Sequence, residues 1–436
     1  MPADDFDYSK LSAELIDFAQ YLEPTATEKR DRSYAFNEIK RTIEREIESS
    51  EVHAFGSYET GLLLPSSDID MRVALGTELP PLHVKRLMQQ LTKEFRRIGR
   101  RGLYHQVLFI PAKIPVIQLV VRSYRNDVSA DISIANDTVS STRTLQWLKE
   151  HKELKPIYLF LKFVLLRIQL ADDPNYCLIS AKTSGLAGYS LVCMIVHYIK
   201  YQAKRNEALN PKAPDYLGCL LMGILEFYGS FDYTAQALQF DDTEFFTKPD
   251  TSEWKHPHKF VIHDPDQPGV NVARSTTTMN RIQAVLCWIR QSLFKTDRRA
   301  SSLIGPLVAR SWRFGARNRE EVYKDGRLSL TGQDIQLDIT HAAKNHGQKR
   351  KRKQSDTEED SRQANTNRAK KAKNWKPKQR QAMQPKQRQR EQQRQSPSKQ
   401  NNHANTKHRF TARKRPVSKY EKPKKYLYSR SLSNQQ

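Results

Sequence analysis

Two aspartates that lie one residue apart, Asp68 and Asp70, have the spacing that most directly suggests chemistry. In a β-strand alternate side chains share a face, so these carboxylates would project together while Ile69 points into the core. Carboxylates held that close repel each other, and a divalent cation relieves the repulsion. Upstream, backbone N–H groups at Gly56 and the hydroxyl of Ser57 could approach a phosphate. The segment therefore predicts an anion cradle beside a cation site, as a nucleoside triphosphate with magnesium requires.

A third carboxylate would complete two-metal chemistry, in which ions about 3.5–4 Å apart activate the attacking oxygen and stabilise the leaving one. An Asp-x-Asp pair alone also occurs in calcium loops, in glycosyltransferases and on exposed strands. The candidate for the third position is Asp131, in the alternating stretch 130–134, which follows the apolar stretch 116–121 across a polar hairpin. In isolation Asp131 would be interpreted as a charge on the solvent face of an edge strand. Beside the first motif, its position favours a catalytic metal site.

The elements that must position these side chains fall into two groups. Alternating or short apolar stretches predict strands, which lie at 52–55, 69–73, 107–110, 116–121 and 130–134. Apolar residues at helical spacing predict a helix near 83–97 and two helices within 11–48. From residue 142 onward the helical spacing dominates, with long stretches at 154–170, 190–201, 217–227 and 279–293.

The expected fold class is therefore α+β, a small mixed-sheet domain plus a helical domain. The expected boundaries are N-terminal helices packing on the helical domain over 1–48, the sheet domain over 49–141, the helical domain over 142–340 and a basic tail over 341–436. The tail contains 29 Lys and Arg against 6 Asp and Glu, whereas the first 340 residues contain 44 and 42. Aliphatic residues nearly vanish in it, and such a composition cannot offset the entropy cost of ordering a backbone. We therefore expect a disordered tail joined to a nearly neutral folded body.

Clusters of basic residues in the tail are suited to nuclear import or to binding RNA phosphates. The clusters are formed by Lys349, Arg350, Lys351, Arg352, Lys353, Arg413, Lys414 and Arg415. For single-stranded RNA, the logarithm of the affinity falls with the logarithm of the salt concentration, and each phosphate contact would steepen that slope by about 0.7. A tail that only improves solubility is the alternative, but a segment with this excess of cations binds nucleic acid in either case.

Composition also excludes some classes of protein. The longest apolar stretches, 157–166 and 191–199, are about half of the roughly 20 residues that a membrane span needs. The N-terminus is acidic where a secretory signal would be basic and then apolar. The four cysteines are too few and too far apart for a disulfide scaffold or a zinc site. We expect no membrane association, and thiols that serve as small core residues in a reducing compartment.

The motifs around the carboxylates resemble those of the DNA-polymerase-β-like nucleotidyltransferases. Their pattern of Gly-Ser, ten residues and Asp-x-Asp is met by Gly56, Ser57, Asp68 and Asp70. The Leu-Pro-x-Ser-Asp-Ile-Asp variant at 64–70 is typical of the non-canonical poly(A) polymerases of the TRAMP (topoisomerase-related-function) type. The resemblance covers roughly residues 7–293 and places the family's third aspartate on Asp131. It implies a palm domain followed by a helical central domain.

The resemblance also implies residues that bind the triphosphate. A lysine in an apolar helix most often extends its ammonium to solvent, but the family's triphosphate-binding lysine falls on Lys162. Relatives with a second cation one helical turn later would have it at the position of Leu166, so Arg167 is the nearest substitute.

Residues that would bind the nucleoside follow in the helical domain. In the small-residue run 184–190, Gly188 would allow close approach, and Tyr189 matches the family's base-stacking tyrosine, although a tyrosine at a helix start is more often core. The segment 216–275 resembles the poly(A)-polymerase-associated segment. In its nucleotide recognition loop, otherwise interpreted as a proline-rich surface loop, the resemblance implies that Asn271 and Arg274 donate hydrogen bonds near the base.

Two further positions bear on the nucleotide. By resemblance Asn136 contacts the ribose, and Val270 occupies the position that bears on base choice. Relatives that add UMP often have histidine there and relatives that add AMP often have asparagine. The absence of histidine favours ATP, and the asparagine of AMP-adding relatives is absent too.

These features predict a template-independent RNA 3′-terminal adenylyltransferase. Its cofactors would be two Mg²⁺ or Mn²⁺ ions on Asp68, Asp70 and Asp131, with ATP as substrate and RNA 3′ ends as acceptors. By resemblance, its partners would be a zinc-knuckle RNA-binding protein and an RNA helicase in a surveillance complex of the nucleus or nucleolus. A terminal uridylyltransferase and an inactive RNA-binding scaffold are the alternatives.

Overall fold

The protein is described by a computed structural model. The structure describes residues 6–112, 114–134, 138–205, 209–241, 244–247, 259–297, 299–309, 312, 328–331 and 334. All of these belong to the first of two compact units, which runs from Met1 to Arg362. The predictions for Asn136 and for the tail over 341–436 lie outside the described residues.

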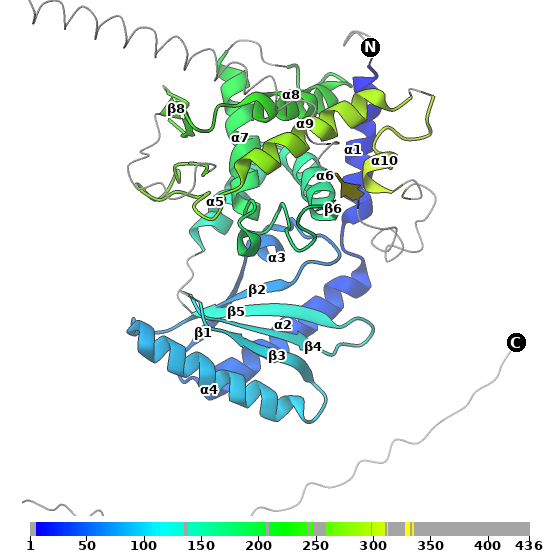
Figure 1. The fold of residues 1–436 in the computed structure, drawn as a ribbon. Coiled ribbons are helices and arrows are strands. Elements are labelled where there is room, and N and C mark those ends of the chain that lie inside the picture. The colour runs from blue at the N-terminus through cyan, green and yellow to red at the C-terminus, as the bar shows by residue number, and fades with distance from the viewer. Residues whose placement is uncertain are drawn as a thin grey trace, which may run out of the picture. The chain divides into compact units, whose positions relative to one another are not determined.

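Among the described residues, five strands form a mixed sheet in the order β1-β2-β5-β4-β3 (Figure 1). The strands are β1 (Glu51–Phe55), β2 (Ile69–Ala74), β3 (Tyr104–Ile110), β4 (Val116–Val121) and β5 (Val128–Ile134). The pair β2–β5 is parallel, and the other neighbouring pairs are antiparallel. The predicted mixed sheet is confirmed, because each predicted strand overlaps one of these five.

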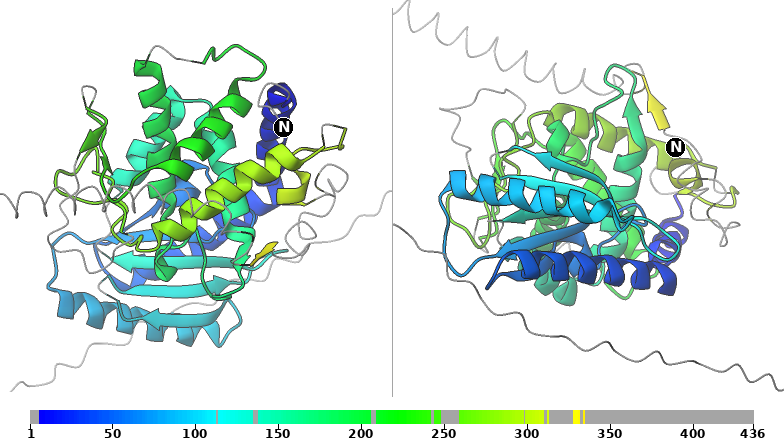
Figure 2. Two further views of the ribbon diagram at one scale, coloured as in Figure 1. Left: turned by 45° about the horizontal axis from the view of Figure 1, so that its top comes forward. Right: turned by 90° about the horizontal axis from the view of Figure 1, so that it is seen from below.

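Two helices, α2 (Ala26–Glu46) and α4 (Pro81–Gly99), cover one face of the sheet (Figures 1 and 2). They bury Ile39 and Phe95 against strand residues such as Met71 and Ile132, and all four side chains have no exposed surface. Side chains alternate along a strand. The residues between these buried ones therefore lie on the opposite face, which α2 and α4 leave uncovered.

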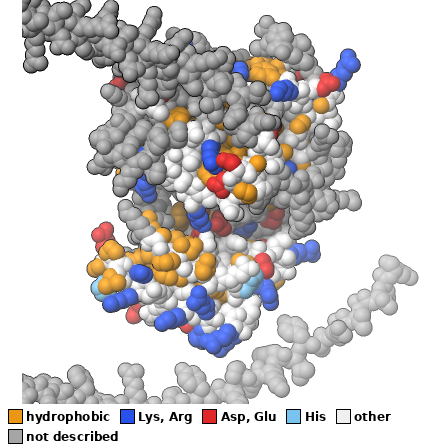
Figure 3. Space-filling model, viewed as in Figure 1, with side chains coloured by type: hydrophobic (Ala, Val, Ile, Leu, Met, Phe, Trp, Pro, Cys, Tyr) orange, Lys and Arg blue, Asp and Glu red, His pale blue; other side chains and the backbone are white. Residues whose placement is uncertain are grey.

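Helix α4 separates apolar from basic side chains around its axis. Val84, Met88 and Leu91 are buried at intervals of three and four residues, as helical periodicity requires. Basic residues on its other side are exposed, and they include Lys85, Arg86, Lys93, Arg97 and Arg100. Figure 3 shows Lys and Arg side chains over this lower part of the molecule, beside a patch of hydrophobic side chains.

The two N-terminal helices pack in different places, which corrects the prediction for 1–48. Helix α1 (Tyr8–Leu22) packs on α6 (Leu154–Arg167) and α8 (Tyr216–Ser230) in the helical layer. Helix α2 instead buries Ala35, Ile39 and Ile43 in the core of the sheet. An apolar stripe at helical spacing shows that a helix is amphipathic but does not select the surface that covers it.

The helical layer shares one apolar core. Its other helices are α5 (Val139–Glu150), α7 (Gly188–Lys204), α9 (Met279–Lys295) and α10 (Gly305–Val308). The predicted helix 154–170 ends at Arg167, because Ile168–Leu170 forms strand β6 and pairs with β9 (Leu328–Leu330). The strands β7 (Ala237–Leu238) and β8 (Phe246–Thr247) form a second short pair. Within the described ranges, no helix combines the length and apolar character that crossing a membrane requires.

Candidate active site

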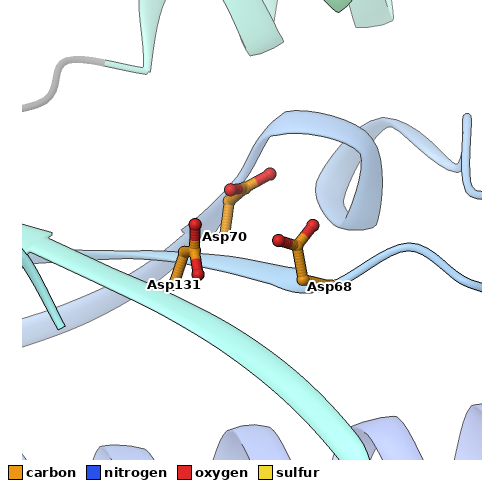
Figure 4. Close-up of side chains that lie close together, drawn as sticks. All are labelled: Asp68, Asp70 and Asp131. Atoms are coloured by element: carbon orange, nitrogen blue, oxygen red, sulfur yellow. The ribbon is translucent and has the colours of Figure 1, made fainter. Parts of the chain in front are cut away.

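Strand pairing brings three carboxylates together on the face of the sheet away from α2 and α4. In the parallel pair β2–β5, Asp70 stands opposite Asp131, and Asp68 lies just before β2. One oxygen from each carboxylate lies within 4.8 Å of the other two. Figure 4 shows the three side chains close together on the same side of the strands, with Asp70 on β2, Asp131 on β5 and Asp68 just before β2. The structure therefore brings together the three residues that the sequence analysis singled out.

At Asp68 and Asp70, burial and mutual repulsion outweigh the opposing charges of Lys162 and Lys182. Burial raises the pKa of Asp70 to about 7, and the charges of Asp68 and Asp131 add to the shift. Burial, followed by the charge of Asp131, also raises the pKa of Asp68. Carboxylate oxygens are the ligands that Mg²⁺ prefers, and a bound cation would remove the cost of keeping these groups ionised together. The residues present therefore fit a divalent metal site.

Asp131 has two hydrogen-bond donors that the sequence analysis did not identify. Gln118, its direct partner on β4, donates from Nε2 to Oδ1 at 2.9 Å and to Oδ2 at 3.0 Å. Lys182 donates from the helical layer to Oδ2 at 3.1 Å. Gln118 was detectable as the polar residue within an apolar strand, whereas nothing local marks Lys182.

Gly56 provides the space that Asp70 occupies. The residue has a φ of +66°, and a Cβ atom on it would lie 2.5 Å from Asp70 Oδ2. It begins a short helix, α3 (Gly56–Thr60). The backbone N–H of Gly56 donates to Ser141 Oγ on α5 at 2.8 Å, and Thr60 donates to the Gly56 carbonyl at 2.9 Å. These bonds hold the turn between the sheet and α5.

Arg32 braces the chain that leads into the Asp-x-Asp motif. This buried residue of α2 donates to the carbonyls of Pro65 at 2.9 Å and Ser67 at 3.0 Å. Ser67 in turn accepts the backbone N–H of Leu64 at 3.0 Å. In the sequence, Arg32 could have been recognised as a charged residue on the apolar stripe of this helix, which continues through Ala35.

A cavity of about 510 Å³ opens beside the carboxylates, between the sheet and the helical layer. The predicted site residues that line it are Gly56, Ser57, Asp68, Asp70, Lys162, Gly188 and Tyr189. Lys162 Nζ donates to the Leu62 carbonyl at 3.3 Å and lies 5.5 Å from the centre of the Tyr158 ring. Burial lowers the pKa of Lys162, and the charges of Asp70 and Asp68 oppose this shift. An anion bound in the cavity would stabilise the ammonium.

Tyr189 is the outer member of an aromatic stack beside the cavity. Its ring lies 6.3 Å from that of Trp147 at an interplanar angle of 21°, and Trp147 lies 5.2 Å from Phe240. Trp147 is buried, whereas Tyr189 is half-buried and lines the cavity. The stack therefore supports a flat surface on which a planar group could bind.

The proposed recognition loop lies beside this stack, but its predicted base donors do not line the cavity. The loop is tied to α5 because Arg143 donates to Asp266 from Nε at 2.8 Å and from a second nitrogen. The side-chain amide of Asn271 bonds to backbone groups, accepting from Ile262 N and Ala273 N and donating to the Phe260 carbonyl. Arg274 is exposed. That these two residues contact the base stays a prediction.

Arg167 does not supply a second cation in place of Leu166, the residue one helical turn after Lys162. Leu166 lines the cavity, in agreement with its helical spacing from Lys162. Arg167 is buried on another side of α6, where its guanidinium donates to the Val308 carbonyl and lies 5.6 Å from the Phe163 ring centre. The expectation that Arg167 could replace a second cation is therefore wrong, because adjacent helical residues point about 100° apart.

Comparisons with known proteins agree with this architecture. The family model described as "Poly(A) RNA polymerase, mitochondrial-like, central palm domain" matches residues 11–149, and the model "Cid1 family poly A polymerase" matches residues 216–269. Poly(A) RNA polymerase protein 1 of Saccharomyces cerevisiae is 23% identical over 316 residues, which are 68% of this chain and 47% of the relative. The chain thus spans about half the length of that relative.

Two solved structures share the fold. The polymerase core of TRAMP, described as an RNA surveillance complex, has a TM-score of 0.57 and 23% identity over 70% of this chain and 96% of that chain. The Cid1 poly(U) polymerase with Mg and 3′-dATP bound has a TM-score of 0.54 and 19% identity, over 70% of this chain and 99% of that chain.

Proposed function

Since this chain belongs to the non-canonical poly(A) RNA polymerases, a family of nucleotidyltransferases, we propose that it adds AMP residues to RNA 3′ ends without a template. The observation that carries the proposal is the convergence of Asp68, Asp70 and Asp131 beside a cavity lined by Lys162 and Tyr189. This arrangement places a candidate cation site, a half-buried ammonium and an aromatic surface around one space of about 510 Å³.

Each of these side chains would have its own role in nucleotidyl transfer. Mg²⁺ or Mn²⁺ ions held by the three aspartates would supply Lewis-acid stabilisation and lower the pKa of the attacking hydroxyl. Lys162 would neutralise the triphosphate, and Ser57 would donate to its oxygens. Tyr189, supported from behind by Trp147, would hold the base. Gly56 leaves the space in which Asp70 keeps its orientation.

Removing the Tyr189 ring is expected to weaken nucleotide binding. Stacking of a base on an aromatic ring contributes about 1–3 kcal/mol, so Tyr189→Ala should raise the KM for ATP by about 5- to 150-fold. Tyr189→Phe keeps the ring and should stay within about 3-fold of wild type. Steady-state kinetics with saturating RNA would measure both. Equal KM values for Tyr189→Ala and wild type would contradict a stacking role.

The choice of base is tested by supplying each of the four nucleotides in turn with Mg²⁺ and a short RNA. We expect ATP to extend the RNA at least about ten-fold faster than UTP, a difference of about 1.4 kcal/mol between transition states. A preference for UTP would identify the uridylyltransferase alternative. If none of the four nucleotides extends the RNA, the inactive RNA-binding scaffold would be the remaining alternative.

The role of the tail is tested by removing residues 341–436 and measuring nucleotide binding, RNA affinity and RNA extension. If the folded unit is the enzyme, the truncated chain should keep nucleotide binding and lose RNA affinity, mainly at higher salt, because counterion release governs phosphate contacts. Loss of nucleotide binding on truncation would contradict this division of roles.

We also propose a nuclear surveillance role with a zinc-knuckle RNA-binding protein and an RNA helicase as partners. The similarity to the TRAMP polymerase core supports this part of the proposal, as does the basic cluster 349–353, which suits nuclear import. Affinity purification of the tagged full-length chain from nuclear extract, followed by mass spectrometry, would test it.

A further inference from the structure

Asp131 has different surroundings from Asp68 and Asp70. Asp68 and Asp70 line the cavity that also contains Lys162 and Tyr189, whereas neither Asp131 nor Lys182 is among the residues that line it. Lys182 contacts Asp131 through the oxygen Oδ2 at 3.1 Å. The Asp131 end of the cluster therefore has a cation of its own.

The backbone that carries Lys182 is firmly held. Lys182 lies in a 3₁₀ turn (Ala181–Thr183) of the helical layer. Thr183 Oγ1 donates to the Cys177 carbonyl at 2.8 Å, and Gly185 N donates to the Ser180 carbonyl at 2.9 Å. These bonds fix the turn, and the lysine side chain reaches from it to Asp131 on β5.

The ion pair itself is weak enough to be exchanged. The Lys182 side chain is 65% exposed, although that of Asp131 is only 16% exposed. An ion pair with so exposed an ammonium is weak, because solvent screens the charge of the lysine. A divalent ion on Asp131 would compete with the ammonium for the same oxygen, and the displaced ammonium would stay at the solvent edge of the carboxylates.

The chemistry of the transfer identifies the anion that this lysine would meet. In an in-line displacement, the attacking hydroxyl and the leaving pyrophosphate lie on opposite sides of the α-phosphate. With the triphosphate in the cavity beside Lys162, the acceptor strand must approach from the side of Asp131. We propose that Lys182 binds the 3′-terminal phosphodiester of the acceptor RNA and so positions the strand, an inference that rests on the proposed function.

The test compares the full-length wild type with Lys182→Gln, Lys182→Arg and the control Lys152→Gln, which removes another exposed lysine of the helical layer. The probe is a short RNA that ends in a 3′-deoxynucleotide and cannot be extended, and its affinity is measured with Mg²⁺ across a range of salt concentrations. Because every variant keeps the tail, differences between variants report on the substituted residue.

Lys182→Gln is expected to weaken RNA binding by about 3- to 10-fold and to lower the salt slope by about 0.7, the value for one phosphate contact. Lys182→Arg and Lys152→Gln should bind like wild type. In extension assays, the KM for RNA should rise in Lys182→Gln while the KM for ATP stays unchanged. Affinity for Mn²⁺ without RNA should not fall, because a competing cation has been removed.

Equal RNA affinity of wild type and Lys182→Gln, or an equal loss in Lys152→Gln, would overturn the inference. A rise in the KM for ATP with no change for RNA would also overturn it, because the lysine would then act on the nucleotide. Failure of the proposed function has a different signature, which is that the wild type extends RNA with none of the four nucleotides.

Discussion

Asp70→Asn should abolish RNA extension and at the same time make the metal-free protein more stable above neutral pH. The amide cannot replace a charged ligand of the metal site, and loss of several kcal/mol of transition-state stabilisation corresponds to a decrease of about 10³-fold or more. Asp68→Asn should cause a similar loss, because its carboxylate belongs to the same cluster.

The gain in stability follows from the pKa of Asp70. Folding raises that pKa from 3.8 to about 7, mainly by burial. Between these values the folded state binds more protons than the unfolded state, so stability falls as pH rises, and the full penalty is present above pH 7. Asparagine carries no charge at any pH, so the variant should gain up to about 4 kcal/mol at pH 8 and little below pH 4.

Urea unfolding in the presence of a chelator at pH 4 and pH 8 measures the change in stability, and an extension assay with Mg²⁺ measures activity. Asp172→Asn is a control because Asp172 is exposed and lies outside the cluster. Substantial extension by Asp70→Asn would contradict the assignment of the metal site. A loss of stability at pH 8 would contradict the proposed repulsion.

Gly56→Ala is expected to damage the site through a single methyl group. The new Cβ would lie 2.5 Å from Asp70 Oδ2, on a backbone with φ of +66°. The carboxylate would have to move, and a displacement of about 1 Å in a catalytic group can cost about 100-fold in rate. The left-handed backbone adds about 1–3 kcal/mol of destabilisation. We therefore expect about 100-fold slower extension by a protein that still folds.

Gly61→Ala separates the two effects. Gly61 also has a left-handed φ, of +72°, but nothing lies within 4 Å of a Cβ placed there. The two variants should lose similar stability in thermal unfolding, whereas only Gly56→Ala should lose most of its extension rate. If both slow extension equally, the backbone rather than the contact with Asp70 is responsible.

Local patterns in the sequence were sufficient to predict the strands of the sheet and to identify the three carboxylates. Alternation of apolar and polar residues placed Ile69 in the core with Asp68 and Asp70 to either side, and it placed Asp131 on a strand. These features depend on neighbours within a few residues, so they can be read without knowing the rest of the fold.

The contacts of these residues were decided by tertiary structure. Parallel pairing of β2 with β5 sets Asp70 beside Asp131, residues 61 positions apart in the sequence, and the packing of two layers brings Lys182 to Asp131. Likewise, Arg32 braces the 65–67 segment only because α2 packs on the sheet rather than on the helical layer. The physical reason is that periodicity shows which side of an element is buried, whereas the partner depends on the mutual fit of distant surfaces.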